Sequence, residues 1–520
     1  MVRIQLRSSD VGDKINTLNG EDGDGNMKPI SSVEHFGAID ADNDDLLFSC
    51  FEDHEAYLDL VSQKKFLITG RKGSGKTAIF KKMITPRSHD FFCFGHTFSD
   101  YPWHHHDLQA RMGIPDFDKF THSWKYLILM TASKMVLNYD QSLPISPDTM
   151  EDMLRIEQFI VDTYGTRDPD VTQIFTPTKN LKVKPSFEVD LKILKAGISP
   201  EKVPMSELPK IVQELNSNLI TCVMNSLNPF HRYYVLFDQL DLGFDPTAPD
   251  YANRLIGLIL ACRDLNLASR QRGKQFFAAV FLRDDIYDGL QFEDKNKITE
   301  NYVSLIEWDT PRTNKSLKHL MERRFHSLLG AEGEDVSWEN VFDETKEMPG
   351  HQTKYQHILD RTYLRPRDII KFCNSILGKY KARISKEGGD GPIHNADIHD
   401  ARVEYSIYFQ NELDDEIHKH IPRYKDYLDV VRKLGSWQFT REEFETAYNT
   451  SLPTSDKNYQ SALNELYAFS ILGFYRPGGR GFGGSEYVFR YKEPQTQFDS
   501  SALRFRVHPG LIEVLGLKRV

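Results

Sequence analysis

Residues 70–77 read GRKGSGKT, a full match to the phosphate-binding pattern GxxxxGK[ST]. The glycines let successive backbone N–H groups turn toward a phosphate without Cβ clashes. The Lys76 ammonium can then reach the outer phosphates of a nucleotide, and the Thr77 hydroxyl can bind Mg2+. An apolar run precedes the pattern, and the helix expected after it adds its positive end to the site. The residues expected to contact the nucleotide are Gly70, Arg71, Lys72, Gly73, Ser74, Gly75, Lys76, Thr77 and Ala78.

A second candidate group follows the apolar run YYVLF at residues 233–237. A carboxylate at the end of such a strand, downstream of a phosphate loop, is suited to hold the Mg2+ shell, and Asp238 has this position. The alternative for Asp238 is an ordinary cap at the strand end. The next residue, Gln239, is a neutral amide that can orient water but is a poor base. Asp241 is therefore the better candidate for activating a water molecule.

Arg283 is a third candidate, because it ends another apolar run, residues 276–282. Its place after Asp238 would let it contact the γ-phosphate and report whether that phosphate is present. A structural salt bridge to Asp284 or Asp285 is the alternative. The sequence leaves both interpretations open.

A fourth candidate group surrounds Pro366, a residue suited to the first turn of a helix. Arg365 and Arg367 lie on either side of it. In a lid packed over a nucleotide, Arg367 could reach the γ-phosphate, with Arg365 as the alternative. Surface capping of the helix by either arginine is the remaining interpretation.

Short apolar runs alternate with helical patterns through the first three hundred residues, which is typical of a parallel sheet covered on both faces. The sequence therefore predicts an α/β fold with a P-loop NTPase core. Alternating residues at 182–194 predict a small inserted hairpin. Strands are expected at 66–69, 91–94, 233–237, 276–282 and 302–308, and helices at 45–61, 76–84, 120–136, 150–164, 205–226 and 251–267.

Composition divides the chain into four parts. Residues 1–33, rich in glycine and acids, predict a flexible tail before an ATPase core at 34–312. Residues 313–420 predict a helical lid with connecting helices, interrupted by a glycine-rich break at 386–391. Residues 421–520 predict a winged helix, with three helices before a hairpin that has a glycine-rich tip. The helices expected in these last two parts are 315–329, 336–347, 366–380, 397–419, 424–434, 441–448 and 457–469, and the hairpin strands are 473–476 and 487–491.

The net charge of -10 argues against a protein whose whole surface coats nucleic acid. Residues 421–520 nevertheless hold 14 Lys and Arg against 11 Asp and Glu, a net charge of about +3. The winged helix could contact DNA or dock a protein. Its basic candidates are Arg476, Arg480, Arg490 and Lys492 on the hairpin and Lys457 at the predicted recognition helix.

Composition also excludes several classes of protein. No apolar run approaches the ~20 residues of a membrane span, and the N-terminus lacks the apolar core of a secretory signal. Five dispersed cysteines indicate a reducing, cytoplasmic setting. Residues 104–106 are three histidines without the spacing of a metal site, so we interpret them as a polar loop. We expect the neighbouring Trp103, Trp124 and Tyr126 to belong to the core.

Taken together, GRKGSGKT, FDQLD at 237–241, FLRDD at 281–285 and YLRPRDII at 363–370 resemble, in order and spacing, the motifs of AAA+ and STAND-type ATPases. The layout is similar to the replication-initiator branch, which carries a C-terminal winged helix. The stretches at 70–77, 282–287 and 365–370 resemble those of bacterial P-loop ATPases encoded beside antiphage and mobile-element genes. The resemblance covers about residues 36–515. It implies Arg283 as sensor 1 and Arg367 as sensor 2.

The resemblance implies a protein that binds ATP and Mg2+ and self-associates. This chain departs from typical AAA+ proteins because Gln239 stands where a glutamate follows the aspartate, which favours a slow switch. We expect a regulatory ATPase of antiphage defence that acts with a separate effector. The alternative is a DNA-binding initiator, partition or regulatory ATPase. No arginine finger can be chosen from the sequence among Arg254, Arg263 and Arg270.

Overall fold

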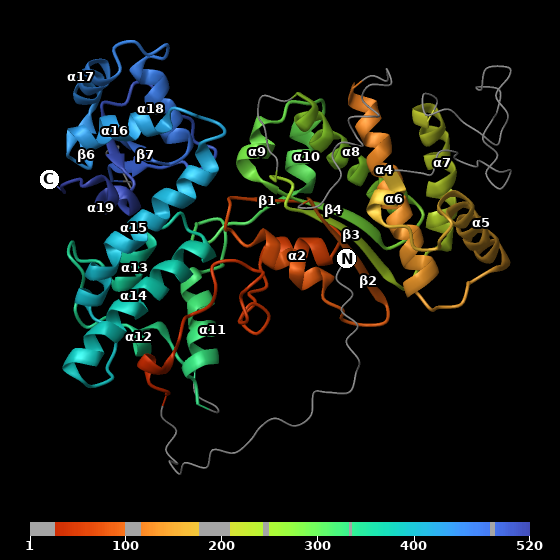
Figure 1. Cartoon of the computed structure of the whole chain (residues 1–520), viewed down its shortest axis with the longest axis horizontal. Coiled ribbons are helices and arrows are strands. Elements are labelled where there is room, and N and C mark those ends of the chain that lie inside the picture. Colours follow the sequence, from red (N-terminus) through yellow and green to blue (C-terminus); the bar gives the residue numbers. More distant parts are fainter. Residues whose placement is uncertain are drawn as a thin grey trace.

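The computed structural model of the protein describes residues 27–98, 116–175, 208–242, 249–331, 335–478 and 484–519. Its elements fall into a sheet-containing core, a group of helices beside it and a small C-terminal module (Figure 1). Several expectations lie outside the described residues: most of the tail, the hairpin at 182–194, Trp103, the histidines at 104–106 and Arg480.

The core contains a five-stranded parallel sheet in the order β2-β3-β4-β1-β5. The strands are β1 (Leu67–Gly70), β2 (Phe91–Thr97), β3 (Arg232–Asp238), β4 (Phe276–Arg283) and β5 (Val303–Leu305). All overlap the predicted runs, but β5 is much shorter than the predicted strand at 302–308. Gly70 pairs with Arg283 in register, and Thr97 pairs with Asp238. Because all strands run the same way, the end of β1 and the ends of β3 and β4 meet at one edge of the sheet.

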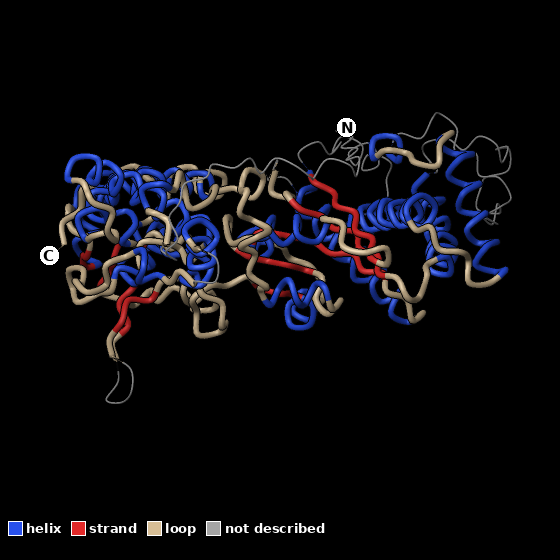
Figure 2. Tube along the Cα trace, turned by 90° about the horizontal axis from the view of Figure 1, so that it is seen from below, coloured by secondary structure: helices blue, strands red, loops and turns tan. Residues whose placement is uncertain are grey.

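Helices lie on both sides of this sheet (Figure 1, Figure 2). The apolar strands, of which β1 and β4 are buried along their whole length, require this double cover. The described core helices are α1 (Glu55–Val61), α2 (Lys76–Ile84), α4 (Asp116–Lys134), α5 (Pro147–Tyr164), α6 (Val171–Phe175), α7 (Leu208–Ser226), α8 (Pro249–Gln271), α9 (Asp284–Gly289) and α10 (Lys295–Tyr302). Trp124 and Tyr126 are buried on α4, as expected of core residues.

Two predicted helices are much shorter than expected. The run 45–61 is helical only in α1, because Asp44 accepts backbone N–H groups of Ala38 and Leu46 and so stabilises turns before the helix. The run 336–347 is helical only in α12 (Trp338–Val341), because Phe342 leaves the helix to form a β-bridge with Ile393.

The helical group beside the core is built on two long helices, α14 (Pro366–Glu387) and α15 (Asn395–Ile417), which pack against each other. Phe372 and Tyr405 stack between them with ring centroids 4.1 Å apart. The predicted glycine break holds, since Gly388 ends α14 with φ of 71°. Shorter helices complete the group: α11 (Leu317–Leu329) and α13 (Lys354–Leu359).

The C-terminal module has three helices, α16 (Tyr424–Leu434), α17 (Arg441–Ser451) and α18 (Tyr459–Ala468), and a four-stranded antiparallel sheet in the order β6-β9-β7-β8. The hairpin strands β7 (Leu472–Arg476) and β8 (Glu486–Val488) were expected, and their hairpin projects from the body (Figure 2). The strands β6 (Gln438–Thr440) and β9 (Arg504–Val507) were not predicted. The chain ends after η6 (Pro509–Leu511) and α19 (Ile512–Leu515).

The N-terminal segment is ordered earlier than expected. Residues 30–32 form the short helix η1 (Ile30–Ser32), and both Ile30 and Val33 are buried.

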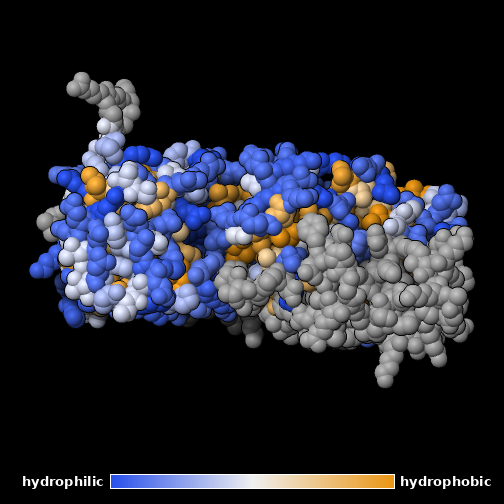
Figure 3. All heavy atoms as spheres, turned by 90° about the horizontal axis from the view of Figure 1, so that it is seen from above, coloured by the Kyte–Doolittle hydropathy of each residue, from blue (hydrophilic) through white to orange (hydrophobic). Residues whose placement is uncertain are grey.

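Hydrophilic residues cover most of the visible face of the C-terminal side in Figure 3, with apolar residues nearer the middle of the molecule. Among the described helices, none has the length and apolar character that a membrane crossing needs.

Candidate nucleotide-binding site

The loop between β1 and α2 has the backbone that a phosphate cradle requires. Gly73 and Gly75 have φ angles of 80° and 109°, which residues with a Cβ rarely adopt. Gly75 directly precedes α2, so the helix directs its first N–H groups toward the loop. The Lys76 ammonium lies across the loop and donates to the carbonyl oxygens of Gly70 and Arg71, at 2.7 and 2.9 Å.

This loop borders a cavity of about 350 Å³. Loop and helix residues form one wall, the ends of β3 and β4 form another, and α14 together with an N-terminal segment closes the remaining sides. The polar and charged residues lining it are Asp40, Asp42, Asp44, Lys72, Lys76, Thr77, Asp238, Gln239, Asp241, Arg283, Arg324 and Arg367. The structure therefore brings the candidates Lys76, Thr77, Asp238, Asp241, Arg283 and Arg367 to a single cavity.

Asp238 and Thr77 have the chemistry of a magnesium site. Asp238 is buried, its Oδ2 has no hydrogen-bond partner among the described residues, and the nearby Thr77 side chain lowers its pKa. Burial raises the Asp238 pKa to about 6, against the lowering effects of the Gln239 N–H, Thr77 and Lys76. A buried carboxylate oxygen without a partner, beside a hydroxyl, fits a hard cation that prefers oxygen ligands.

Acidification is expected to weaken binding of Mg2+ and ATP through Asp238. Its folded pKa of about 6 exceeds the ordinary value of 3.8, so folding favours the protonated form. The stability gained from this group is present at low pH and is lost as the pH rises through that interval. Mg2+ requires the charged form, so its affinity should fall about tenfold per unit below pH 6. Calorimetric titration from pH 7.5 to 5 measures this, and an Asp238→Asn profile parallel to the wild type would contradict it.

Burial also lowers the pKa of Lys76, although Asp241, Asp284 and Asp238 raise it. Their carboxylates keep a positive charge available at the base of the cavity. A bound polyphosphate would stabilise that charge further, because it would bring negative oxygens to a desolvated ammonium.

Arg283 forms the predicted salt bridge and also lines the cavity. Its side chain is buried and forms a two-point ion pair with Asp285, at 2.9 and 2.6 Å. The remaining nitrogen, Nη1, lies 3.7 Å from Asp241 in the cavity. The salt bridge to Asp285 therefore positions Arg283 at the cavity wall.

Gln239 adopts a left-handed φ of 59°, a conformation that costs a residue with a side chain about 1–2 kcal/mol.

The two arginines beside Pro366 have different surroundings: Arg367 lines the cavity and Arg365 does not. Arg367 lies over the loop, with its backbone N–H 3.5 Å from the Gly73 carbonyl and its Nη1 3.0 Å from Glu412. A Cβ placed on Gly73 would approach the Arg367 side chain to 3.0 Å. Arg365 is buried on the other side of the loop, away from the cavity, where it holds Asp368 and the Lys72 carbonyl.

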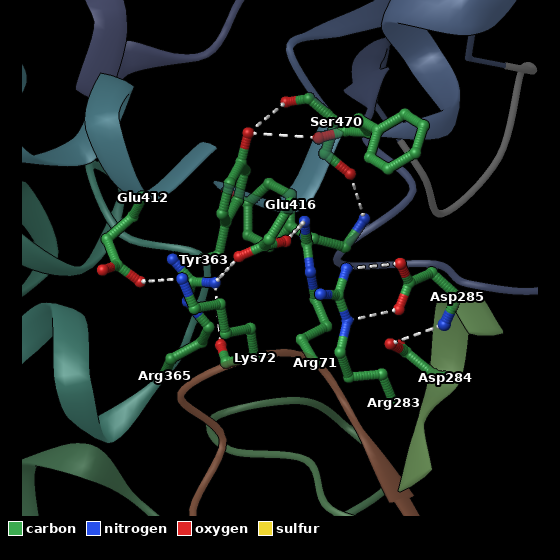
Figure 4. Close-up of polar contacts among 12 residues, drawn as sticks. Arg71, Lys72, Arg283, Asp284, Asp285, Tyr363, Arg365, Glu412, Glu416 and Ser470 are labelled. Carbon is green, nitrogen blue, oxygen red and sulfur yellow. Dashed lines mark hydrogen bonds and ion pairs between the residues drawn. The ribbon is translucent and has the colours of Figure 1, made fainter. Parts of the chain in front are cut away.

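Acids of α15 hold the outer face of the phosphate loop (Figure 4). Arg71 lies 4.0 Å from the centre of the Tyr363 ring and 3.5 Å from Glu416. Lys72 pairs with Asp415 at 2.7 Å and with Glu412 at 3.5 Å. The Arg71 side chain therefore faces a second cavity, of about 340 Å³, and does not line the phosphate cavity. These ion pairs therefore link the position of the phosphate loop to the position of α15.

The second cavity lies where the core, the helices and the C-terminal module meet. Asp285 accepts a hydrogen bond from His420 Nε2 at 3.1 Å, and Arg490 pairs with Asp288 at 2.8 Å. The Tyr363 hydroxyl donates to the carbonyl of Ser470 at 3.3 Å (Figure 4). The segments beside the phosphate loop are therefore attached to the C-terminal module by polar contacts.

Sequence reasoning missed the N-terminal wall of the cavity, residues 38–44. Asp44 pairs with the buried Arg324, and Asp42 pairs with Lys81 of α2 at 2.6 Å. A Cβ on Gly37 would lie 1.8 Å from Arg324 Nη1, so only glycine fits there. The conspicuous acids at 40–45 were the available signal, but their partners are distant in the chain.

Comparison with known proteins gives three results. A family model described as the FunZ-associated C-terminal helical domain matches residues 315–414. The transposon gamma-delta 80.3 kDa protein of Escherichia coli (strain K12) is 22% identical over 507 residues, covering 92% of this chain. The chain spans 66% of that relative, slightly less than two thirds of its length.

The solved structure of Cdc6p from Pyrobaculum aerophilum aligns over 88% of this chain and 90% of its own, at 12% identity and a TM-score of 0.28. The α/β class rests on the parallel sheet, the phosphate loop and the helices of this chain.

Proposed function

We propose that the chain is an ATP-binding molecular switch of the AAA+ kind that uses Mg2+ and hydrolyses ATP slowly. The observation that carries the proposal is the single cavity that Lys76, Thr77, Asp238, Arg283 and Arg367 line together. These groups supply a phosphate cradle, a metal site and two cations at the position of a terminal phosphate. Gln239 in place of a carboxylate supports slow turnover, because an amide does not accept a proton from water.

In this switch, ATP draws the lid toward the core. Arg367 contacts the γ-phosphate as sensor 2, and Arg283 acts as sensor 1. Because Glu412 binds both Arg367 and Lys72, a γ-phosphate competes with that carboxylate for the same arginine. Movement of Arg367 toward the phosphate then breaks its pair with Glu412, while Asp415 and Glu416 keep α15 at the loop, and hydrolysis restores the original pairing.

Residues 34–312 are the proposed ATPase core, 313–420 the lid and 421–520 a winged-helix module. Three helices followed by a projecting hairpin support the last assignment. The relative named for a transposon supports a role among mobile elements. We therefore propose a regulatory ATPase of antiphage defence that acts with a separate effector protein.

The alternative, an ATPase that loads on DNA through its winged helix, has less support. The described basic residues expected to contact DNA are paired with acids: Arg476 with Glu486 and Glu493, Arg490 with Asp288, Lys492 with Asp360 and Lys457 with Glu465. Side chains already paired with carboxylates gain less from a phosphate backbone.

ATP is expected to change the assembly state of the wild-type protein, and Arg367→Ala is expected to abolish that change while ATP still binds. The reason is that Arg367 is proposed to join the γ-phosphate to the lid, whereas Lys76 provides affinity. Light scattering with ATP, with ADP and without nucleotide measures particle size. Arg432→Ala, an exposed arginine of α16 paired with Asp429, is the matched control. Identical particle size of the wild type in all three conditions would contradict the switch.

A further inference from the structure

A third cavity, of about 180 Å³, lies between the helical group and the C-terminal module. Four cationic side chains line it: Arg361, Lys492, Arg506 and Arg519. Asp360 is the single carboxylate among its lining residues. Behind the wall, Glu513 lies 3.4 Å from Arg402 and 3.9 Å from Arg361, so this second acid is shared with a fifth cation. The cavity therefore has an excess of about three positive charges.

Arg361 is the deepest of these cations. The residue is buried at 1% exposure, yet Nε and Nη2 have no hydrogen-bond partner among the described residues. Nη1 alone donates, to the His357 carbonyl at 3.0 Å. Burial, together with the charges of Arg519 and Arg402, lowers the pKa of Arg361 to about 9 against the opposing effect of Glu513. A buried guanidinium with unused donors is costly, so it indicates a site for an acceptor.

Aromatic rings take the place that carboxylates have in an ordinary ion pair. Arg506 lies 3.8 Å from the centre of the Tyr487 ring and 4.6 Å from that of Trp437, and Arg519 lies 5.1 Å from Trp437. When the Gln438 amide is oriented with its oxygen toward Arg506, this neutral oxygen accepts hydrogen bonds from the guanidinium. The rings hold both guanidinium groups in place without neutralising them. The buried indole N–H of Trp437 adds another donor without a partner among the described residues.

We propose that this cavity binds a phosphate monoester, with Arg361 at its base and Arg506 and Arg519 at its mouth. A dianionic phosphate offsets more of the charge excess than a carboxylate does, and guanidinium groups bind its oxygens in pairs. The available volume has room for one phosphate group and a few atoms esterified to it. The aromatic faces are already covered by arginines, so the site recognises the phosphate and not a stacked base.

The position of the cavity gives the ligand a route to the ATP site. Arg361 precedes Arg365 by four residues, and Arg365 donates to the Lys72 carbonyl of the phosphate loop. The Tyr363 N–H in the connecting segment is fixed by Asp368, the same carboxylate that pairs with Arg365. An anion bound at Arg361 is therefore joined to the loop by one short, buried segment.

The test uses the full chain carrying Lys76→Ala, which removes the main phosphate contact at the ATP site. Orthophosphate is titrated by calorimetry at constant ionic strength. Arg506→Gln with Arg519→Gln should weaken binding at least tenfold. The matched control, Arg504→Gln with Lys518→Gln, removes equal charge from neighbouring positions that do not line the cavity and should stay within twofold. Arg361 itself is not substituted, because its burial makes misfolding a competing explanation.

Absence of saturable orthophosphate binding in the Lys76→Ala protein, or equal losses in the two double variants, would overturn the proposal without bearing on ATP binding. Two further probes identify the source of the phosphate. If a 5′-phosphorylated oligonucleotide binds at least tenfold more tightly than both its 5′-hydroxyl form and adenosine monophosphate, the ligand is the end of a nucleic acid. If adenosine monophosphate binds as tightly as the oligonucleotide, the ligand is a free phosphate monoester.

Discussion

Replacing Lys76 with alanine is expected to weaken ATP binding at least about 30-fold. The Lys76 ammonium lies at the centre of the phosphate loop, where it donates to the carbonyls of Gly70 and Arg71. Truncating one partner of a buried charged pair costs about 2–5 kcal/mol. That range corresponds to a loss of affinity from roughly 30-fold to several thousand-fold. Calorimetric titration with ATP and Mg2+ measures the change directly.

The control for this variant is Lys82→Ala on the same helix. The Lys82 ammonium lies 5.2 Å from the centre of the Phe51 ring and does not line the nucleotide cavity, so its removal should leave ATP affinity within twofold. Thermal melting without nucleotide shows whether Lys76→Ala still folds. A folded Lys76→Ala protein with wild-type affinity would contradict the proposed ATP site.

Arg365→Ala is expected to destabilise the protein by about 3–5 kcal/mol, the cost of breaking a buried ion pair by removing one partner. Arg365 is 2% exposed and its partners Asp368 and Glu416 are 0% and 5% exposed. Its loss leaves the Asp368 carboxylate buried without its cation and frees the Lys72 carbonyl. The free energy of unfolding in urea measures the effect.

Arg367→Ala provides the comparison, because Arg367 is only two residues away but partly exposed, with its side chain at 22%. Its ion pair with Glu412 should contribute no more than about 1 kcal/mol to stability. Arg365→Ala should therefore affect folding and Arg367→Ala should affect the response to ATP. Equal stabilities of the two variants would contradict the structural role assigned to Arg365.

Local patterns in the sequence predicted much of the sheet-containing core. The range 76–84 predicted for α2 agrees with Lys76–Ile84, because the glycine before it and the apolar spacing within it are both local signals. The strands that carry Asp238 and Arg283 were also expected, since fully buried parallel strands appear as continuous apolar runs. Parallel pairing then necessarily brought these residues to one edge of the sheet.

The parts that escaped prediction depend on partners distant in the chain. Arg365 and Arg367 have equivalent sequence surroundings, and only the folded position of Glu416 and Glu412 distinguishes them. The N-terminal wall has no periodic sequence pattern. Its position depends on ion pairs with Arg324 and Lys81, which are distant in the chain. The strand β9 alternates arginines with Phe505 and Val507. This pattern is only four residues long, too short to predict a strand after a loop.

The helix α15 has a mechanical consequence. It is 23 residues long, or about 35 Å at 1.5 Å per residue. Its last turns carry Glu412 and Glu416 beside the phosphate loop, while Ser406 donates to the Gly510 carbonyl near the end of the chain, at 2.7 Å. The helix therefore resembles a lever with one arm at the loop. Ser406 lies about 15 Å from Glu416 along the helix axis, so a tilt of about 5° at the loop would displace the Ser406 contact with the C-terminal module by about 1 Å.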